Sequence, residues 1–159
     1  MLLAVLTVSD RCSRGEAQDT AGPAVVALLR QAWPEGEIEA ALVPDEPDRI
    51  GARLTEWAER RVRLILTVGG TGLGPRDRTP EATRRVLDRE APGIAEAMRI
   101  AGAASNPMAW LSRAVAGTRD NTLIVNLPGS SRGAQESLTA ILPLLRHGLE
   151  TMAGTEKHA

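Results

Sequence analysis

Short apolar runs alternate with amphipathic stretches along the chain. Four runs rich in apolar and β-branched residues have polar flanks, and they predict strands at Leu2 to Val8, Ile38 to Val43, Arg63 to Val68 and Thr122 to Leu127. Apolar runs this short are typical of strands that are buried on both faces of a largely parallel sheet. The pattern therefore predicts an interior sheet whose strands are separated by helices.

The stretches between these runs carry helical spacing. Ile50, Leu54 and Trp57 recur at i, i+4 and i+7, which places them on one helix face. Thr79 is predicted as a helix N-cap, with Pro80 at the first helical position. The other predicted helices cover Pro23 to Gln31, Ile94 to about Ala103, a short turn from Asn106 to Leu111, and a last helix that begins near Ser131 and is kinked by Pro143.

Strands that alternate with helices predict an α/β fold class. Arg113 to Thr118 is predicted to pair with Thr122 to Leu127 across Arg119-Asp120-Asn121, and so short a connection makes this pair antiparallel. The expected sheet is therefore mixed and mostly parallel, with one antiparallel strand. We expect a single domain over residues 1–153 and a polar tail over residues 154–159.

Composition narrows the classes of function. The 159 residues suit one domain, and a formal net charge of -1 argues against a nucleic-acid partner. Phe and Tyr are absent, so platforms on which bases stack are hard to build. The single cysteine, Cys12, suits a reducing cytosol. The first apolar run ends at Asp10, far short of the ~20 residues that span a bilayer, so we expect a cytoplasmic protein with no membrane partner.

Small and polar residues follow three of the predicted strands. Ligands of open α/β sheets bind at the carboxyl ends of the strands, where small residues let backbone N–H groups approach an anion. The three segments are Ser9-Asp10-Arg11, Gly69-Gly70-Thr71-Gly72 and Pro128-Gly129-Ser130-Ser131. We expect them to form one anion-binding edge.

The richest segment, LTVGGTGLGPRDRTPEAT, runs from Leu66 to Thr83. It is not a Walker A loop, because it lacks the Gly-Lys-Ser/Thr ending, and Pro75 breaks the dinucleotide fingerprint. Asp77 stands between Arg76 and Arg78, just before a predicted helix. The residues leave two interpretations open: Asp77 belongs to an anion site, or it caps a turn beside solvated arginines.

Other acidic residues add candidates. Asp45 and Glu46 follow the second predicted strand, and they either hold Mg²⁺ together with phosphate oxygens or form a solvated turn. Asp10 either accepts a hydrogen bond from a ligand or caps a loop. The histidines, His147 and His158, match no metal-site spacing, and Ser130 lacks the nucleophile-elbow pattern.

Five ordered blocks carry a resemblance to a known family. The blocks are TVSDRCSRGEAQDTAGP from Thr7, LTVGGTGLGPRDRTPEAT from Leu66, APGIAEAMR from Ala91, LSRAVAG from Leu111 and NLPGSSRGAQESL from Asn126. The chain resembles the bacterial Mog/MoaB group and the G domains of plant and animal molybdenum-cofactor enzymes such as gephyrin. The resemblance covers nearly the whole chain, and its GGTG-x4-D-x-TPE block is highly specific.

The resemblance implies a three-layer α/β/α fold, a homotrimer and a reaction. Active members convert molybdopterin and ATP, with Mg²⁺, into adenylyl-molybdopterin and pyrophosphate, and a downstream molybdate-insertion enzyme uses the product. The family pattern assigns catalysis and metal binding to Asp77 and Asp45. Together with the loop arguments, it yields an expected substrate-binding set of Ser9, Asp10, Gly69, Gly70, Thr71, Gly72, Arg76, Pro128, Gly129, Ser130 and Ser131.

Two further interpretations stay open. A non-catalytic molybdopterin-binding or scaffolding protein of the MoaB type would keep the loops without turning over ATP. A molybdate-insertion domain is less favoured, because 159 residues leave no room for the extra domains of those larger enzymes. Within the favoured reaction, we expect the loop from Gly70 to Asp77 to serve the phosphates and the loop from Pro128 to Ser131 to hold the pterin end.

Overall fold

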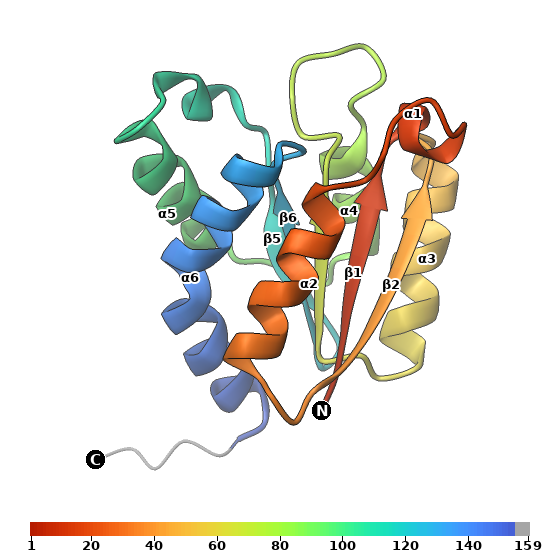
Figure 1. Ribbon diagram of the computed structural model, residues 1–159. Helices are drawn as coiled ribbons and strands as arrows, with labels where there is room; N and C mark the ends of the chain where they lie inside the picture. Colours follow the sequence, from red (N-terminus) through yellow and green to blue (C-terminus); the bar gives the residue numbers. More distant parts are fainter. Residues whose placement is uncertain (155–159) are drawn as a thin grey trace.

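In residues 1–154, which the computed structural model describes, six strands form one sheet (Figure 1). The strands are β1 (Leu2–Val8), β2 (Glu37–Val43), β3 (Leu64–Val68), β4 (Arg89–Glu90), β5 (Ala116–Arg119) and β6 (Thr122–Leu127). Their order across the sheet is β2-β1-β3-β6-β5-β4. The neighbours β2, β1, β3 and β6 are parallel, whereas β5 pairs antiparallel with both β6 and β4. The predicted mostly parallel sheet with one antiparallel strand is confirmed.

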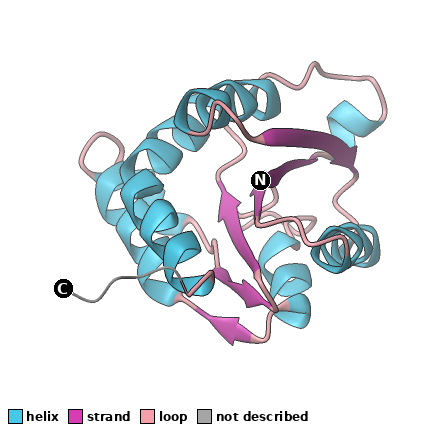
Figure 2. Cartoon of the chain, turned by 90° about the horizontal axis from the view of Figure 1, so that it is seen from below, coloured by secondary structure: helices cyan, strands magenta, loops and turns pink. Residues whose placement is uncertain are grey.

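Helices cover both faces of this sheet, which confirms the three-layer arrangement (Figure 2). One face carries α2 (Ala21–Ala32), α5 (Pro92–Ala103) and α6 (Ser131–Met152), and the other carries α3 (Pro47–Glu59) and α4 (Thr79–Val86). Two short helices, α1 (Asp10–Ser13) and the 3-10 helix η1 (Pro107–Leu111), lie in the loops. None of the helices in the described part of the chain combines the length and apolar content that crossing a membrane requires.

The strand β1 explains why its sequence is apolar without alternation. Leu3 and Val5 pack into the core beneath α2 and α6, while Ala4 and Leu6 pack into the core beneath α3 and α4. Successive strand residues point to opposite faces, so a strand covered on both sides buries every side chain. Shortening a fully buried leucine such as Leu6 to alanine would cost about 2–5 kcal/mol.

The structure corrects the predicted start of α4. The helix begins at Thr79 itself, Arg78 occupies the N-cap position without a capping bond from its side chain, and Pro80 lies one residue further in than predicted. The prediction of Thr79 as the N-cap is therefore wrong. Thr79 is fully buried, and its hydroxyl has no hydrogen-bond partner among the described residues. The hydroxyl faces inward, toward Gly70, instead of capping the helix.

Other boundaries differ from the predicted ones. The short elements α1 and β4 were not expected, and β5 begins three residues later than predicted and includes Arg119. The hairpin connection is thereby reduced to Asp120-Asn121, with Asp120 at a φ of 48°. Helix α6 runs unbroken through Pro143, so the predicted kink stays a prediction. Most of the predicted polar tail and His158 lie outside the described residues, and the division at residue 153 stays a prediction.

Candidate functional site

The carboxyl ends of β1, β2, β3 and β6 meet at one edge of the sheet, at the top of Figure 1. The register explains this, because Leu6 of β1 lies opposite both Ala41 of β2 and Thr67 of β3. Two pockets of about 400 Å³ each open at this edge. Gly70, Asp77 and Gly129 line both pockets, so these three residues mark the place where the two pockets adjoin.

The first pocket carries the acidic residues, and we call it the acidic pocket; Ser9, Asp10, Asp45, Gly69 and Asp77 lie in its wall. Asp10 and Asp45, which lie 35 residues apart in the sequence, are joined by two reciprocal hydrogen bonds. The Asp10 N–H donates to Asp45 Oδ2 at 2.8 Å, and the Asp45 N–H donates to Asp10 Oδ1 at 3.0 Å. The structure thus brings two of the predicted acids together.

The carboxyl groups of Asp10 and Asp45 have pKa values shifted in opposite directions. The side chain of Arg76 donates two hydrogen bonds to Asp10, at 2.9 and 3.0 Å, and this pairing lowers the pKa of the Asp10 carboxyl. Burial raises the pKa of Asp45, and the nearby charges of Asp10 and Asp77 raise it further. Asp19 also lies in this wall, and its two oxygens accept hydrogen bonds from the Thr7 hydroxyl and the Gly22 N–H. Since Arg76 compensates Asp10 and Asp19 is occupied in this way, Asp45 and Asp77 are the carboxylates best placed to meet a cation.

Asp77 caps a turn of its own loop. Its N–H donates to the Gly74 carbonyl at 3.0 Å, and its Oδ2 accepts from the Gly74 N–H at 2.9 Å. A Cβ added at Gly72 or Gly74 would lie 2.9 or 2.8 Å from Asp77 Oδ2, so the Asp77 carboxylate would have to shift from this position if either glycine carried a side chain. The turn-capping interpretation is confirmed for Asp77 itself, whereas Arg76, which that interpretation left solvated, pairs with Asp10. Asp77 also lines both pockets, so the interpretation that it belongs to an anion site stays open.

Two adjacent glycines make the strand end turn sharply. Gly69 and Gly70 adopt φ values of 105° and 68°, a region that favours glycine. A Cβ at Gly69 would lie 2.4 Å from the Val8 carbonyl oxygen, and one at Gly70 would lie 2.2 Å from Thr79 Oγ1 and 3.0 Å from Asp45 Oδ1. The loop can approach Asp45 and α4 this closely only because these side chains are missing.

The carboxylates of Asp45 and Asp77 fit Mg²⁺ in a particular way. Among residues 1–154, no three His, Cys, Asp or Glu side chains gather into a metal site. Magnesium in phosphate-transfer sites is commonly held by one or two carboxylates, waters and substrate phosphate oxygens. In both residues a backbone N–H occupies Oδ2, and Oδ1 makes no hydrogen bond within the described residues. This donor set suits a cation that is bound jointly with phosphates.

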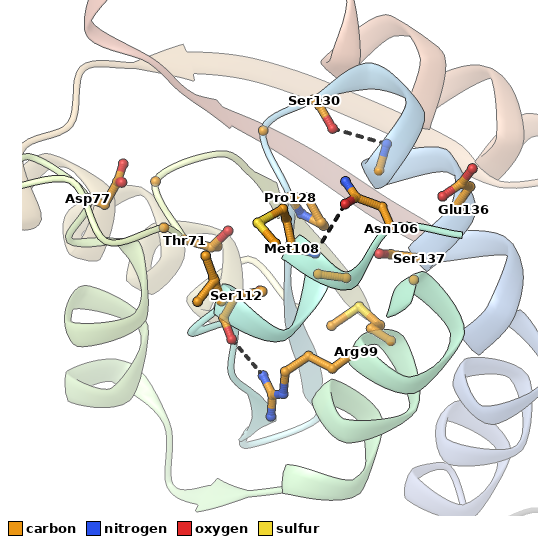
Figure 3. A pocket seen from close by; sticks show the side chains of 18 residues that line it. Thr71, Asp77, Arg99, Asn106, Met108, Ser112, Pro128, Ser130, Glu136 and Ser137 are labelled. Carbon is orange, nitrogen blue, oxygen red and sulfur yellow. Dashed lines mark hydrogen bonds between the residues drawn. The ribbon is translucent and has the colours of Figure 1, made fainter. Parts of the chain in front are cut away.

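The second pocket lies between the loop after β6, the amino end of α6 and η1, and we call it the helical pocket. Ser130 is the N-cap of α6, and its Oγ accepts a hydrogen bond from the Gly133 N–H at 3.1 Å (Figure 3). Pro128, Gly129 and Ser130 line this pocket together with Gly70, Thr71 and Gly72. The two predicted loops therefore face one cavity. Ser131 and Arg76 line neither pocket.

The far wall of the helical pocket was missed by the sequence analysis. Figure 3 shows Asp77 and Thr71 on one side and Glu136 and Ser137 on the opposite side. The wall residues that the expected substrate-binding set leaves out are Met98, Arg99, Gly102, Asn106, Met108, Ala109, Leu111, Ser112, Gly133, Glu136 and Ser137. They come from α5, η1 and α6, whose spacing indicates helices but not which surface borders a cavity.

A buried polar network underlies the acid-bearing loop. Asn126 of β6 is fully buried, and its side-chain amide donates to Thr67 Oγ1 and Thr83 Oγ1, both at 2.9 Å. Thr83 in turn donates to the Thr79 carbonyl at 2.8 Å. Buried hydrogen bonds of this kind fix relative positions, because breaking one leaves an unpaired polar group. The start of α4 is thereby fixed to two central strands.

Comparisons with known proteins agree with this architecture. A family described as "probable molybdopterin binding domain" matches residues 4–147. Gephyrin of Dictyostelium discoideum is 41% identical over 157 residues, which cover 93% of this chain and 22% of that protein. The molybdopterin adenylyltransferase of Helicobacter pylori J99 is 37% identical over 154 residues, covering 96% of this chain and 88% of that protein.

Solved structures repeat the fold. The crystal structure of the molybdopterin biosynthesis enzyme MoaB from Thermus thermophilus is 55% identical, with a TM-score of 0.86 and 96% of each chain covered. The chain spans between 22% and 47% of the length of the first three curated relatives that it matches.

Proposed function

The chain belongs to the family of probable molybdopterin binding domains, and from this premise we propose that it is a molybdopterin adenylyltransferase of molybdenum cofactor biosynthesis. The proposed reaction joins molybdopterin and ATP into adenylyl-molybdopterin and releases pyrophosphate. The relatives named for this activity in Helicobacter pylori and Haemophilus influenzae support the proposal at 37% and 42% identity.

One observation carries the proposal: two pockets meet at Gly70, Asp77 and Gly129. Transfer between two large substrates needs two binding regions whose reacting ends touch at a common point. The carboxylate of Asp77 stands at that point beside two glycines, Gly70 and Gly129. The arrangement suits a reaction between two phosphates better than hydrolysis of a single substrate.

The proposed reaction requires that the two phosphates be aligned and that the charge of the triphosphate be neutralised. The terminal phosphate of molybdopterin attacks the α-phosphorus of ATP in line, the new P–O bond forms, and the bond to pyrophosphate breaks. A phosphate monoester is already a nucleophile, so no strong general base is needed. The glycine loop aligns the phosphates through its N–H groups. Asp45 and Asp77 would hold Mg²⁺, which when bound neutralises triphosphate charge and helps pyrophosphate leave.

The two loops divide the substrates in this proposal. The loop from Gly70 to Asp77 serves the phosphates at the reacting centre, because it combines small residues and flanking arginines with a carboxylate that would hold Mg²⁺. The loop from Pro128 to Ser131 helps to hold the pterin end of molybdopterin. Met98 and Met108 in the wall of the helical pocket support this division, since a flat heteroaromatic ring packs well against flexible thioethers.

The competing function is a molybdopterin-binding or scaffolding protein that does not turn over ATP. Incubation of the purified protein with molybdopterin, Mg²⁺ and ATP, followed by an assay of pyrophosphate, separates the two. We expect pyrophosphate release that depends on molybdopterin, with a reaction lacking molybdopterin as the control. Tight molybdopterin binding by calorimetry without pyrophosphate release would favour the scaffold.

Three properties of the proposed enzyme come from the resemblance. We propose that it works in the cytoplasm, passes its product to a molybdate-insertion enzyme and forms a homotrimer. Light scattering at micromolar concentration should give a mass near three times 16.9 kDa. A mass near one subunit would contradict the trimer without touching the proposed reaction.

A further inference from the structure

Arg113 reaches from the segment between η1 and β5 into the loop that carries Asp77. Its Nε donates to the Gly72 carbonyl at 2.8 Å, and its Nη2 donates to the Asp77 carbonyl at 2.7 Å. Its backbone N–H donates to the Thr71 carbonyl at 2.9 Å. One residue therefore holds both ends of the stretch from Thr71 to Asp77, from outside that stretch.

The charge of Arg113 is already compensated. Its Nη1 donates to the carboxylate of Glu81, in the first turn of α4, and this hydrogen bond lowers the pKa of Glu81. A guanidinium paired with a carboxylate and two carbonyls is a weak receptor for a further anion. Its planar fork, however, fixes several acceptors at defined angles, which an ammonium group cannot do.

The loop has few other supports. Between Gly72 and Asp77 the chain is exposed, and the side chain of Leu73 is 67% exposed to solvent. The two bonds between Gly74 and Asp77 are internal to the loop and cannot attach it to the rest of the molecule. The side chain of Arg76 ties the loop to Asp10, and Arg113 holds the loop's main chain at Gly72 and at Asp77, where the carboxylate must be aimed.

We propose that Arg113 is the positioning residue of Asp77. Its guanidinium closes residues 72–77 into one rigid loop, and Glu81 anchors the guanidinium on α4. The catalytic part of this inference rests on the proposed function, because it takes Asp77 as the carboxylate that meets the phosphates and their cation. The rigidity of the loop does not depend on that function.

Amide hydrogen exchange tests the rigidity directly. We compare the native protein with Arg113→Gln and with Arg113→Lys, which keeps the charge and loses the fork. The matched control is Arg119→Gln, because Arg119 also donates to a main-chain carbonyl, that of Val86, at the opposite end of α4. Both Arg113 variants should speed exchange at the Gly74 and Asp77 amides at least tenfold and leave the exchange rate of the Gly133 amide unchanged. The control Arg119→Gln should not speed exchange at Gly74 or Asp77.

Turnover tests the positioning. Pyrophosphate release by both Arg113 variants should fall roughly 100-fold, the scale of a misplaced catalytic group, with lysine no better than glutamine. Restoration by lysine of the rate or of slow exchange would overturn the proposal, since charge alone would then suffice. Unchanged exchange at Gly74 would overturn it as well.

This design distinguishes failure of the proposed function from failure of the positioning role of Arg113. If the native protein releases no pyrophosphate, the proposed function fails, while the exchange measurement still decides whether Arg113 holds the loop. If Arg113→Gln does not fold, Glu81→Gln replaces it, because that change removes the charged anchor and keeps both carbonyl contacts. Faster exchange at Gly74 in Glu81→Gln then supports the proposal, and exchange equal to that of the native protein overturns it.

Discussion

The loop after β3 and the loop after β6 line the same cavity and are stabilised by different means. Residues 69–78 form a long loop that turns on two glycines with positive φ and is held by the distant side chain of Arg113. Residues 128–130 form a short loop that runs directly into the 22-residue helix α6 and is closed by the Ser130 cap.

The difference also separates their electrostatics. The first loop carries the carboxylate of Asp77, whereas the second ends at the amino end of a long helix, where unpaired N–H groups and the helix dipole favour negative charge. The long first loop is held by the side chain of Arg113, whereas the short second loop is shaped by the helix that follows it. Substitutions in the two loops should therefore fail in different ways.

Removing the carboxylate of the first loop should have the largest effect. Asp77→Ala should keep the fold, because the side chain is half-buried in a loop and fills no core space, but lose adenylyl transfer. Losing a metal carboxylate removes several kcal/mol of transition-state stabilisation. The assay is pyrophosphate release. Asp77→Asn is the matched control, because its amide oxygen can still accept the Gly74 N–H while its charge is gone. Release equal to that of the native protein at saturating Mg²⁺ would refute the assigned role.

Adding a methyl group at the sharp turn tests the close approach of that loop. Gly70→Ala should lower the free energy of unfolding by about 2–5 kcal/mol, from positive φ and from the contact with Thr79 Oγ1. Gly15→Ala is the control, because Gly15 has a φ of 72° and nothing within 4 Å of its added Cβ. Urea unfolding of both variants measures the difference. Equal losses would mean that packing at Gly70 contributes nothing.

The second loop should respond more mildly. Ser130→Ala removes the cap of α6 and should cost about 1 kcal/mol of unfolding free energy. It should weaken molybdopterin binding by ~0.5–1.5 kcal/mol, near one neutral hydrogen bond, and leave ATP affinity nearly unchanged. Calorimetric titration of each ligand checks this, with Ser130→Thr as the variant that keeps the hydroxyl. Lost ATP affinity with intact molybdopterin affinity would reverse the division between the loops.

The smallest effect should come from lowering the pH until Glu81, the partner of Arg113, takes up a proton. Arg113 holds the pKa of Glu81 below its ordinary value of 4.5, so the unfolded chain takes up a proton at higher pH than the folded one. The stability difference between the native protein and Glu81→Gln should be full above pH 4.5 and vanish as the pH falls through the lowered pKa. Thermal unfolding from pH 7 to pH 3 measures it; a difference independent of pH would contradict the pairing.

Local pattern was sufficient for much of the fold. The bounds of β1 and β6 match the predicted runs, and β3 differs by one residue, because a buried parallel strand must be apolar at every position. The start of α6 near Ser131 was also predicted, and the structure shows Ser130 as its N-cap, a position that favours a small polar residue. The edge strand β4 was missed because two charged residues carry no strand pattern.

The sequence by itself determined the mostly parallel α/β sheet, the glycine loops at its carboxyl edge and the acids that follow its strands. Tertiary structure alone decided which partners these groups meet. Arg76 pairs with Asp10 across 66 residues, and Arg113 reaches the Asp77 carbonyl across 36. A residue's tendency to form a strand or a turn depends on its neighbours in sequence, whereas the partner of a charged side chain depends on which strand ends the sheet order brings together.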